Sequence, residues 1–361
     1  MRSLAPLKSA WRGNGMNLLL TEESLKRRAS IDAMLQLIDS QGELYMRGVE
    51  AAERTCIPAT EAGFVIFYGL GGSGIVGHIV STLFEQRSKT PLITYTTASI
   101  PTWVGPNTLV TLLSYSGETL EVLRAARRVL QKGAKVVAIC SGGSLERLAL
   151  DAGIPTVKVT GGMAPRMAVP EMVGAAVSIL ERAGIVEGAE KELTASVKSL
   201  EKVKKLFSAH AELPDNSAKR AAIFLLDHLP HAVSESALHP VALRLKNQLN
   251  ENAKRPCVVI DVPEAMHNTL EALPETKRDR YIIYRWSGED ESIRIQLEFL
   301  KKLLGERVFE ERFNGTLSEV VLSAIMWSDY VSIYHAALQN IDPLPVSKIS
   351  ALRRELAKLK T

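Results

Sequence analysis

The sequence contains little cysteine, few aromatic residues and no long apolar run. Its three cysteines, Cys56, Cys140 and Cys257, are far apart, and they form neither a CxxC pair nor a zinc-like spacing with the seven histidines. This argues against a disulfide framework and predicts a reducing, cytoplasmic environment. No stretch approaches the roughly 20 apolar residues that span a bilayer. The basic segment 1–17 also lacks the apolar core of a secretory signal.

The charge balance is close to neutral. Lysine and arginine together number 44 against 40 aspartates and glutamates, giving a net charge of +4. This charge is too small and too evenly spread to predict nucleic-acid binding. With 46% hydrophobic and 23% charged residues, the composition is typical of a folded globular protein. A length of 361 residues predicts two domains.

Two sets of short apolar runs alternate with helical patterns, and such alternation is typical of βαβ units with buried parallel sheets. We therefore predict an α/β fold with two doubly wound parallel sheets, flavodoxin-like or Rossmann-like. The first 50 residues and residues 316–361 are predicted to be helical, and the domains are predicted to span 1–188 and 189–361. The predicted strands are 64–70, 91–97, 108–116, 134–140 and 154–159, then 220–228, 255–262, 278–286 and 306–313.

A glycine-rich segment, GLGGSG (69–74), follows the first predicted strand and opens a helix. It formally satisfies GxGxxG, which suggests a dinucleotide site. That interpretation needs an acidic residue at the end of the next strand, but PLITYTT (91–97) ends in threonines. A phosphate-binding loop is favoured, because glycines permit close backbone approach and helix N-termini attract anions. A purely structural turn is the remaining alternative.

A second segment, SYSGET (114–119), also lies between a strand and a helix. The carboxyl ends of parallel strands meet at one edge of the sheet, so Ser114, Ser116 and Thr119 are expected to lie near Ser73. Hydroxyl groups and helix-start N–H groups together suit a phosphate monoester. The sequence thus predicts binding of a phosphorylated small molecule. A third turn, CSGGS (140–144), could contribute, or its serines could simply cap a helix.

GGSG followed by SYSGET resembles the sugar isomerase (SIS) domain, a doubly wound fold that binds phosphosugars. Two further segments, LRLKNQLNENAK (243–254) and PEAMHN (263–268), resemble the bifunctional phosphoglucose/phosphomannose isomerases. The resemblance runs from about residue 60 onward. It implies two SIS-type domains, a homodimer, a hexose 6-phosphate substrate and no cofactor. The small net charge and the lack of a long apolar run separately predict no nucleic-acid or membrane partner.

The resemblance also implies roles for individual residues. Glu251 matches the base that moves a proton between C1 and C2 of the sugar, with Glu264 as its rival. His267 matches the ring-opening histidine, which the neighbouring subunit supplies in this family. Arg166 matches the arginine that stabilises the enediolate, although it could instead pair with Glu171. Weaker candidates for the histidine role are His228, His231 and His239.

The predicted function is therefore the interconversion of glucose 6-phosphate, and of mannose 6-phosphate, with fructose 6-phosphate through a cis-enediol. No metal is predicted. Met266 replaces an expected asparagine, and Leu344 replaces a threonine linked to acceptance of both C2 epimers. The alternative function is a non-enzymatic sensor of sugar phosphates. The predicted substrate-binding residues are Gly72, Ser73, Ser114, Ser116, Thr119 and Arg166.

Overall fold

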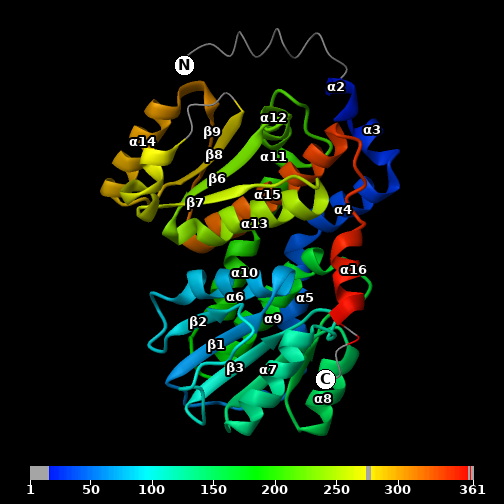
Figure 1. The fold of residues 1–361 in the computed structure, drawn as a ribbon, viewed down its shortest axis with the longest axis vertical. Coiled ribbons are helices and arrows are strands. Elements are labelled where there is room, and N and C mark those ends of the chain that lie inside the picture. Colours follow the sequence, from blue (N-terminus) through cyan, green and yellow to red (C-terminus); the bar gives the residue numbers. More distant parts are fainter. Residues whose placement is uncertain (1–15, 274–277, 357, 359–361) are drawn as a thin grey trace. The chain divides into compact units, whose positions relative to one another are not determined.

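The protein is described by a computed structural model that covers residues 16–273, 278–356 and 358. The chain forms two compact units, each with its own parallel sheet (Figure 1). The first-sheet unit comprises Ser40–Lys198 and Val346–Thr361, and the second-sheet unit comprises Met1–Asp39 and Ser199–Pro345. The predicted domain boundary at residue 188 lies inside the first-sheet unit.

The first-sheet unit contains a five-stranded, fully parallel sheet of order β2-β1-β3-β4-β5. This is the doubly wound order in which the direction of winding reverses between β1 and β3. All five predicted strands are confirmed, and each is one to three residues shorter than predicted. The strands are β1 (Phe64–Gly69), β2 (Leu92–Tyr95), β3 (Thr108–Leu113), β4 (Lys135–Cys140) and β5 (Thr156–Lys158).

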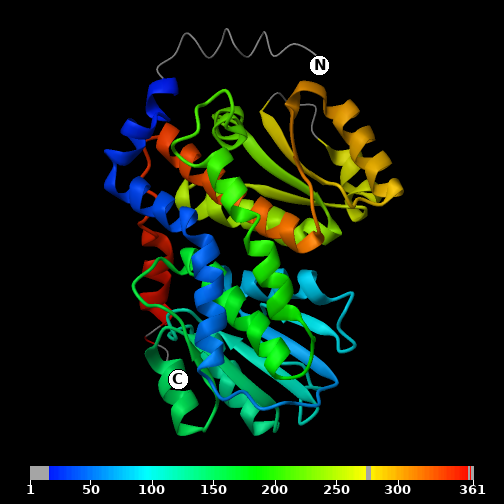
Figure 2. The same cartoon turned by 180° about the vertical axis from the view of Figure 1, so that it is seen from behind.

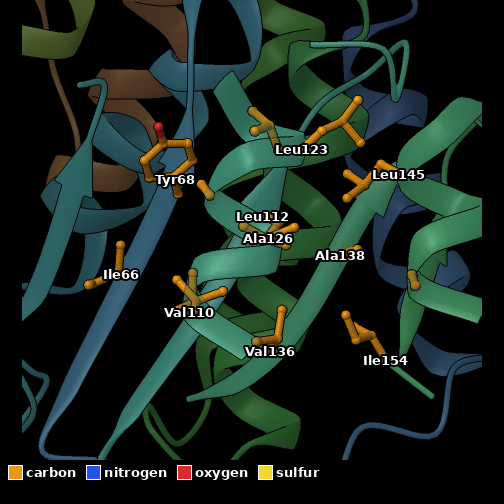
Figure 3. Close-up of a cluster of buried hydrophobic side chains, with 14 of the residues drawn as sticks. Ile66, Tyr68, Val110, Leu112, Leu123, Ala126, Val136, Ala138, Leu145 and Ile154 are labelled. Atoms are coloured by element: carbon orange, nitrogen blue, oxygen red, sulfur yellow. The ribbon is translucent and has the colours of Figure 1, made fainter. Parts of the chain in front are cut away.

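Helices cover both faces of this sheet. The core between one face and helices α7 and α8 includes Ile66, Val110 and Leu112 from the strands, and Ala126 and Leu145 from the helices (Figure 3). Figure 2 shows α5 and α9 on the opposite side. The α-helices of the unit are α5 (Gln41–Glu53), α6 (Gly71–Phe84), α7 (Leu120–Gln131), α8 (Gly143–Asp151), α9 (Val169–Arg182), α10 (Ala189–Val197) and α16 (Ser347–Leu356), with a 3-10 turn at η1 (Pro165–Met167).

Two glycines allow α5 and α9 to pack backbone against backbone. A Cβ added to Gly48 would lie 1.9 Å from the carbonyl oxygen of Glu171, and one added to Gly174 would lie 1.9 Å from that of Tyr45. Both distances are far inside van der Waals contact. The helix crossing therefore requires glycine at each position.

The second-sheet unit contains a four-stranded parallel sheet of order β7-β6-β8-β9. Its strands are β6 (Leu229–Glu235), β7 (Val258–Val262), β8 (Asp279–Trp286) and β9 (Val308–Phe313). The predicted fold, an α/β protein with two parallel sheets, is thus confirmed in both units.

Helix α15 of the second-sheet unit is almost wholly buried, with α4, α11, α12 and α13 packed against it. Helix α4 packs on α15 through an apolar face that includes Ile31, Met34 and Ile38. The helices are α2 (Met16–Leu19), α3 (Glu22–Lys26), α4 (Ala29–Asp39), α11 (Leu200–Phe207), α12 (Ser217–Phe224), α13 (His239–Asn252), α14 (Glu291–Leu304) and α15 (Leu317–Leu338), with 3-10 turns at η2 (Ser236–Leu238), η3 (Glu264–His267), η4 (Thr269–Ala272) and η5 (Gly305–Arg307).

One strand prediction is wrong. Most of residues 220–228 belong to helix α12 and the turns that follow it, and the strand begins only at Leu229. A short apolar run cannot by itself distinguish a buried strand from a buried helix. Here Asn216 decides the outcome, because its side chain accepts a hydrogen bond from Lys219 N and so caps α12.

Helices of the described residues give no candidate for a membrane span, since none is both long and apolar enough. The three cysteines are free thiols. Cys56 is exposed, whereas Cys140 and Cys257 are buried.

Candidate active site

The loops after β1 and β3 meet at the carboxyl edge of the first sheet, because these strands are neighbours with Gly69 paired to Leu113. Leu70 precedes α6 and has no side chain that could cap it. Thr119 precedes α7, but its hydroxyl makes no cap hydrogen bond. Both helices therefore present first-turn N–H groups without an N-cap side chain, at the edge where ligands bind in such sheets.

Three hydroxyl groups of the SYSGET segment lie at the start of α7. Ser114 Oγ donates to Thr119 Oγ1 at 3.0 Å, and Ser116 Oγ accepts from Glu118 N at 3.2 Å. Ser114 is buried, while Ser116 and Thr119 are partly exposed. The cluster is neutral, rich in donors and partly open to solvent, which suits a phosphate group.

Ser73 lies at the same edge but has a structural partner. Its side chain is buried, and its Oγ accepts a hydrogen bond from Tyr115 N at 3.1 Å. The glycine-rich loop and the SYSGET segment are thus directly connected. Ser73 keeps a hydroxyl donor beyond this bond, which is directed at Met172 Sδ at 4.0 Å.

The serines of the third turn connect neighbouring loops. Ser141 Oγ donates to the carbonyl oxygen of Tyr115 at 2.7 Å. Ser144 donates from both its N and its Oγ to the carboxylate of Glu118, each at 2.8 Å. These contacts brace the loop after β4 against the SYSGET segment.

Arg166 follows β5 and lies in the turn η1, which begins at Pro165. Its side chain is only 2% exposed. A Cβ added to Gly72 would lie 3.3 Å from both Cα and N of Arg166. The main chain of the arginine therefore packs against the glycine-rich loop. Glu171 Oε1 accepts from the N and the Oγ1 of Thr160, both at 2.9 Å.

Glu251 lies in the last turn of α13 and is partly buried. The neighbouring face of α13 is fixed to α15 by buried polar contacts. Arg244 donates to both carboxylate oxygens of Asp329 at 2.7 and 2.8 Å, and Gln248 also donates to Asp329 at 2.8 Å. Asn252 donates to Ser332 Oγ at 2.9 Å. This face sets the rotation of the helix and hence the direction of Glu251.

Lys254 connects two segments that the sequence singled out separately. It has a left-handed backbone with φ of +55°. Its Nζ donates to the carbonyl oxygens of Pro345 at 2.7 Å and Pro343 at 3.3 Å, and also to that of Glu251. The NENAK segment and the DPLP segment (342–345) therefore form one local structure.

His267 ends the turn η3 that follows β7, and its side chain is exposed. The turn is anchored by Ala265 and Met266, which pack into the core of the second-sheet unit. Met266, at a position where asparagine was expected, thus has an anchoring role. The rival Glu264 is exposed and accepts a hydrogen bond from Asn268 Nδ2 at 2.7 Å.

The three weaker histidine candidates have local partners. His231 Nε2 lies 2.8 Å from Asp279 Oδ1 in a buried pair, and His239 Nδ1 lies 2.8 Å from Asp261 Oδ1. His228 Nδ1 lies 2.5 Å from the carbonyl oxygen of Leu226. The predicted phosphate-binding residues belong to the first-sheet unit, and so does Arg166. Glu251 and His267 belong to the second-sheet unit.

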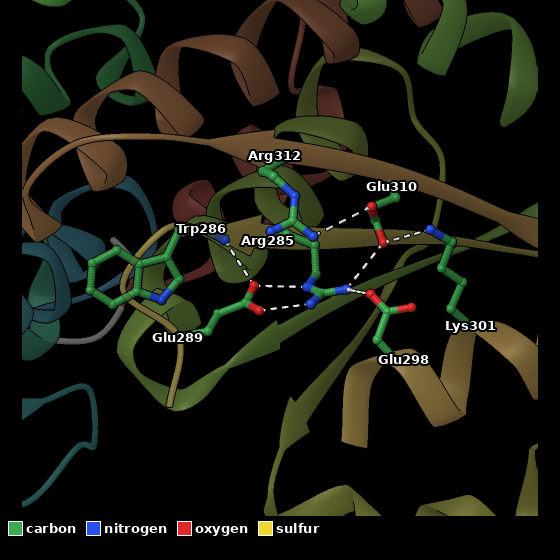
Figure 4. A network of polar contacts seen from close by, with 7 residues as sticks. All are labelled: Arg285, Trp286, Glu289, Glu298, Lys301, Glu310 and Arg312. Carbon is green, nitrogen blue, oxygen red and sulfur yellow. Dashed lines mark hydrogen bonds and ion pairs between the residues drawn. The ribbon is translucent and has the colours of Figure 1, made fainter. Parts of the chain in front are cut away.

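Sequence reasoning missed a charge cluster around the buried Arg285, near the carboxyl end of β8 (Figure 4). Arg285 is fully buried, makes a bidentate ion pair with Glu289, and also contacts Glu298 and Glu310. Burial lowers the pKa of Arg285, but these carboxylates outweigh it and hold that pKa above its usual value. Glu235 ends β6 on the same face. Burial, reinforced by Glu289 and Asp290, raises its pKa to about 7.

Within residues 16–273, 278–356 and 358, no group of three or more His, Cys, Asp or Glu side chains is arranged to hold a metal ion.

Comparison with known proteins agrees with this geometry. The SIS domain model matches residues 60–175, and the model for the bacterial phospho-glucose isomerase C-terminal SIS domain matches residues 214–356. A crystal structure of a hypothetical protein from Thermus thermophilus covers 98% of this chain and 97% of its own, with a TM-score of 0.71 at 15% identity. The chain is therefore a protein of the SIS-domain class.

Two curated relatives narrow the class. A bifunctional phosphoglucose/phosphomannose isomerase from Thermoplasma acidophilum is 30% identical over 305 residues, covering 81% of this chain and 89% of the relative. One from Caldicellulosiruptor bescii is 29% identical over 314 residues, covering 84% and 92%. The chain belongs to the family of bifunctional phosphoglucose/phosphomannose isomerases, and it is accordingly an isomerase.

Proposed function

We propose that this protein interconverts glucose 6-phosphate, and also mannose 6-phosphate, with fructose 6-phosphate through a cis-enediol. The observation that carries the proposal is the neutral hydroxyl cluster at the starts of α6 and α7, with the Arg166 main chain packed on Gly72. This arrangement suits a sugar phosphate and brings an arginine to the same edge of the sheet. Membership of the isomerase family supports the reaction class.

In the proposed complex, the phosphate is held by the hydroxyls of Ser114, Ser116 and Thr119 and by N–H groups near Gly72 and Ser73. Hydroxyl and amide donors can bind a dianion without a basic patch. This agrees with the small net charge of the chain. The phosphate would thus anchor the sugar, and Arg166 would act at its reacting end.

We assign the proton transfer between C1 and C2 to Glu251. A carboxylate can act as general base when it reaches the proton within hydrogen-bonding distance. The polar contacts of α13 with α15 support this role, because they fix the helix on the face next to Glu251. Arg166 would stabilise the negative charge that develops on the enediolate oxygens, a contribution that is often large. This route needs neither a metal nor an organic cofactor.

We assign ring opening to His267, because histidine exchanges protons near neutral pH. Its exposure on an anchored turn is compatible with insertion into the site of a second subunit. The proposed functional unit is therefore a homodimer with shared active sites. The replacement of threonine by Leu344 makes the ratio of mannose to glucose 6-phosphate activity the property most worth measuring.

The sensor alternative receives little support from the N-terminal helices. Arg28 donates from its guanidinium to the carbonyl oxygen of Ala337 in α15 at 2.7 Å, and Tyr330 of α15 donates to Asp39. The described N-terminal helices are thus packed into the second-sheet unit and do not form a separate DNA-binding module.

The deciding experiment measures fructose 6-phosphate formed by the purified protein from each hexose 6-phosphate. We expect activity in the wild type and a loss of at least about a hundredfold in Glu251→Gln, since general-base catalysis contributes about 10²–10⁴. Glu264→Gln is the matched control and should stay active. An inactive wild type rejects the isomerase. If the Glu251→Gln variant is active and the separate Glu264→Gln variant is inactive, Glu264 is the general base.

The shared site is tested by mixing inactive Glu251→Gln with inactive His267→Ala. Subunit exchange should restore up to about a quarter of wild-type activity, because half of the dimers are mixed and each contains one intact site. No recovery, with exchange shown by mass spectrometry, would mean that each site is built from one chain.

A further inference from the structure

Tyr115, which lies between the two serines of the SYSGET segment, connects its own loop to three other segments at the carboxyl edge of the first sheet. Its N donates to Ser73 Oγ at 3.1 Å, in the first turn of α6. Its carbonyl oxygen accepts from the N and the Oγ of Ser141, at 2.8 and 2.7 Å, in the loop after β4. Its Oη contacts Thr160 and Met163, in the loop after β5.

The phenol group makes two complementary hydrogen bonds. Tyr115 Oη donates to the carbonyl oxygen of Thr160 at 3.0 Å and accepts from Met163 N at 2.8 Å. The residue is only 5% exposed, and burial raises the pKa of its hydroxyl. The phenol therefore stays protonated at neutral pH and can donate and accept at the same time.

The loop held in this way leads directly to Arg166. It contains Gly161 and Gly162, of which Gly162 has φ of +88°, so its backbone has little intrinsic stiffness. Glu171 fixes the beginning of the loop through Thr160. The Tyr115 phenol spans the glycines from Thr160 to Met163, three residues before Arg166.

We propose that Tyr115 is a positioning residue that holds Arg166 in a fixed relation to the phosphate-binding turn. The same residue contributes backbone to the phosphate-binding segment and side-chain bonds to the arginine loop. Anchoring of the substrate phosphate and placement of the arginine are therefore connected through one residue, by its backbone and by its side chain respectively. The catalytic part of this proposal rests on the isomerase function proposed above.

The test compares Tyr115→Phe with Tyr68→Phe. Tyr68 is also buried in this unit, and its hydroxyl donates to the carbonyl oxygen of Thr97 at 2.5 Å, in the loop after β2. We expect kcat of Tyr115→Phe to fall by about 10- to 100-fold, since a displacement of roughly 1 Å can cost that much. Its KM should change by less than about threefold, because the phosphate contacts remain.

A second measurement does not depend on turnover. Hydrogen–deuterium exchange followed by mass spectrometry reports on peptides covering residues 160–168. Loss of the phenol frees Met163 N, so we expect faster exchange of this segment in Tyr115→Phe and unchanged exchange in Tyr68→Phe. The peptide covering residues 116–131 serves as an internal reference.

The proposal is overturned if Tyr115→Phe keeps wild-type kcat or wild-type exchange in residues 160–168. It is also overturned if both variants lose activity equally, since that points to general loosening. If the wild-type protein isomerises no hexose 6-phosphate, the proposed function is wrong and the predicted change in kcat no longer applies. The exchange measurement then still decides whether Tyr115 holds the loop.

Discussion

Replacing Glu235 by glutamine should stabilise the protein at alkaline pH and have little effect in acid. Glu235 ends β6, two residues beyond the Val233–Ile283 pair, so it lies on the same face as Arg285 of β8. The residue is 7% exposed, and among the described residues its Oε1 has no hydrogen-bond partner. Glutamine keeps the shape of the side chain but cannot carry the charge.

The direction of the change in stability with pH follows from the raised pKa of Glu235. Below about pH 4.5 the Glu235 carboxyl is protonated in both the folded and the unfolded chain, so it does not lower the free energy of unfolding. Between about 4.5 and about 7 the unfolded chain ionises first, and stability falls as pH rises. Above about pH 7 the ionised carboxylate destabilises the folded protein by its full amount. A rise from 4.5 to about 7 corresponds to about 3 kcal/mol, which solvent screening reduces to about 2 kcal/mol.

The assay is urea denaturation of wild type and Glu235→Gln at several pH values from 5 to 9, followed by tryptophan fluorescence. Trp286 and Trp327 lie in the second-sheet unit and report its unfolding. Glu298→Gln is the control, and it should destabilise the protein at neutral pH. The bond to Arg285 lowers the pKa of Glu298, so its contribution is present at neutral pH and is lost in acid.

A stability gain for Glu235→Gln that is equal at pH 5 and pH 9 would refute the reasoning, because it would not follow ionisation. A loss of stability at pH 9 would show that the ionised carboxylate is favourably paired with Arg285. At pH 9 the two variants should therefore differ from the wild type in opposite directions, and only the difference for Glu235→Gln should change between pH 5 and pH 9.

Three further predictions concern other parts of the chain. Gly174→Ala should lower the thermal midpoint by several degrees or prevent folding, because the new Cβ would lie 1.9 Å from the carbonyl oxygen of Tyr45; a normal calorimetric midpoint would contradict this. Asp329→Asn should cost about 3–5 kcal/mol in urea denaturation by leaving Arg244 buried without its ion pair, and an unchanged transition would show that the pair is dispensable. Leu344→Thr should raise kcat/KM for mannose 6-phosphate relative to glucose 6-phosphate, and an unchanged ratio in steady-state assays would exclude position 344 as a specificity determinant.

The first sheet could be predicted because its strands are continuous apolar runs bounded by turn residues. The β6 strand could not, since LPHAVSE (229–235) contains a proline, a histidine and a glutamate within a buried strand. The apolar run before it matched a strand but is capped as a helix by Asn216. Local pattern alone cannot weigh a cap against an apolar run.

The sequence suggests candidate site residues, but it does not show the contacts that connect them. Short hydroxyl and glycine motifs can be recognised in the sequence. Nothing in the sequence around Tyr115, which lies between two serines, indicates a role for its side chain. Its phenol acts on residues 45 and 48 positions away. The contact of Lys254 with Pro345 spans 91 positions. Such bonds depend on tertiary packing and leave no local signal.

The interleaving of the two units has a consequence for biosynthesis. Helix α4 belongs with α15, yet the whole first-sheet unit is encoded between them apart from α16. At roughly 5–20 residues per second, the ribosome needs about 15–60 seconds to pass from Asp39 to Leu338. During this interval Ile31, Met34 and Ile38 lack the surface on which they finally pack. The apolar face of α4 must therefore be kept from aggregating, for example by a chaperone, until α15 has been synthesised.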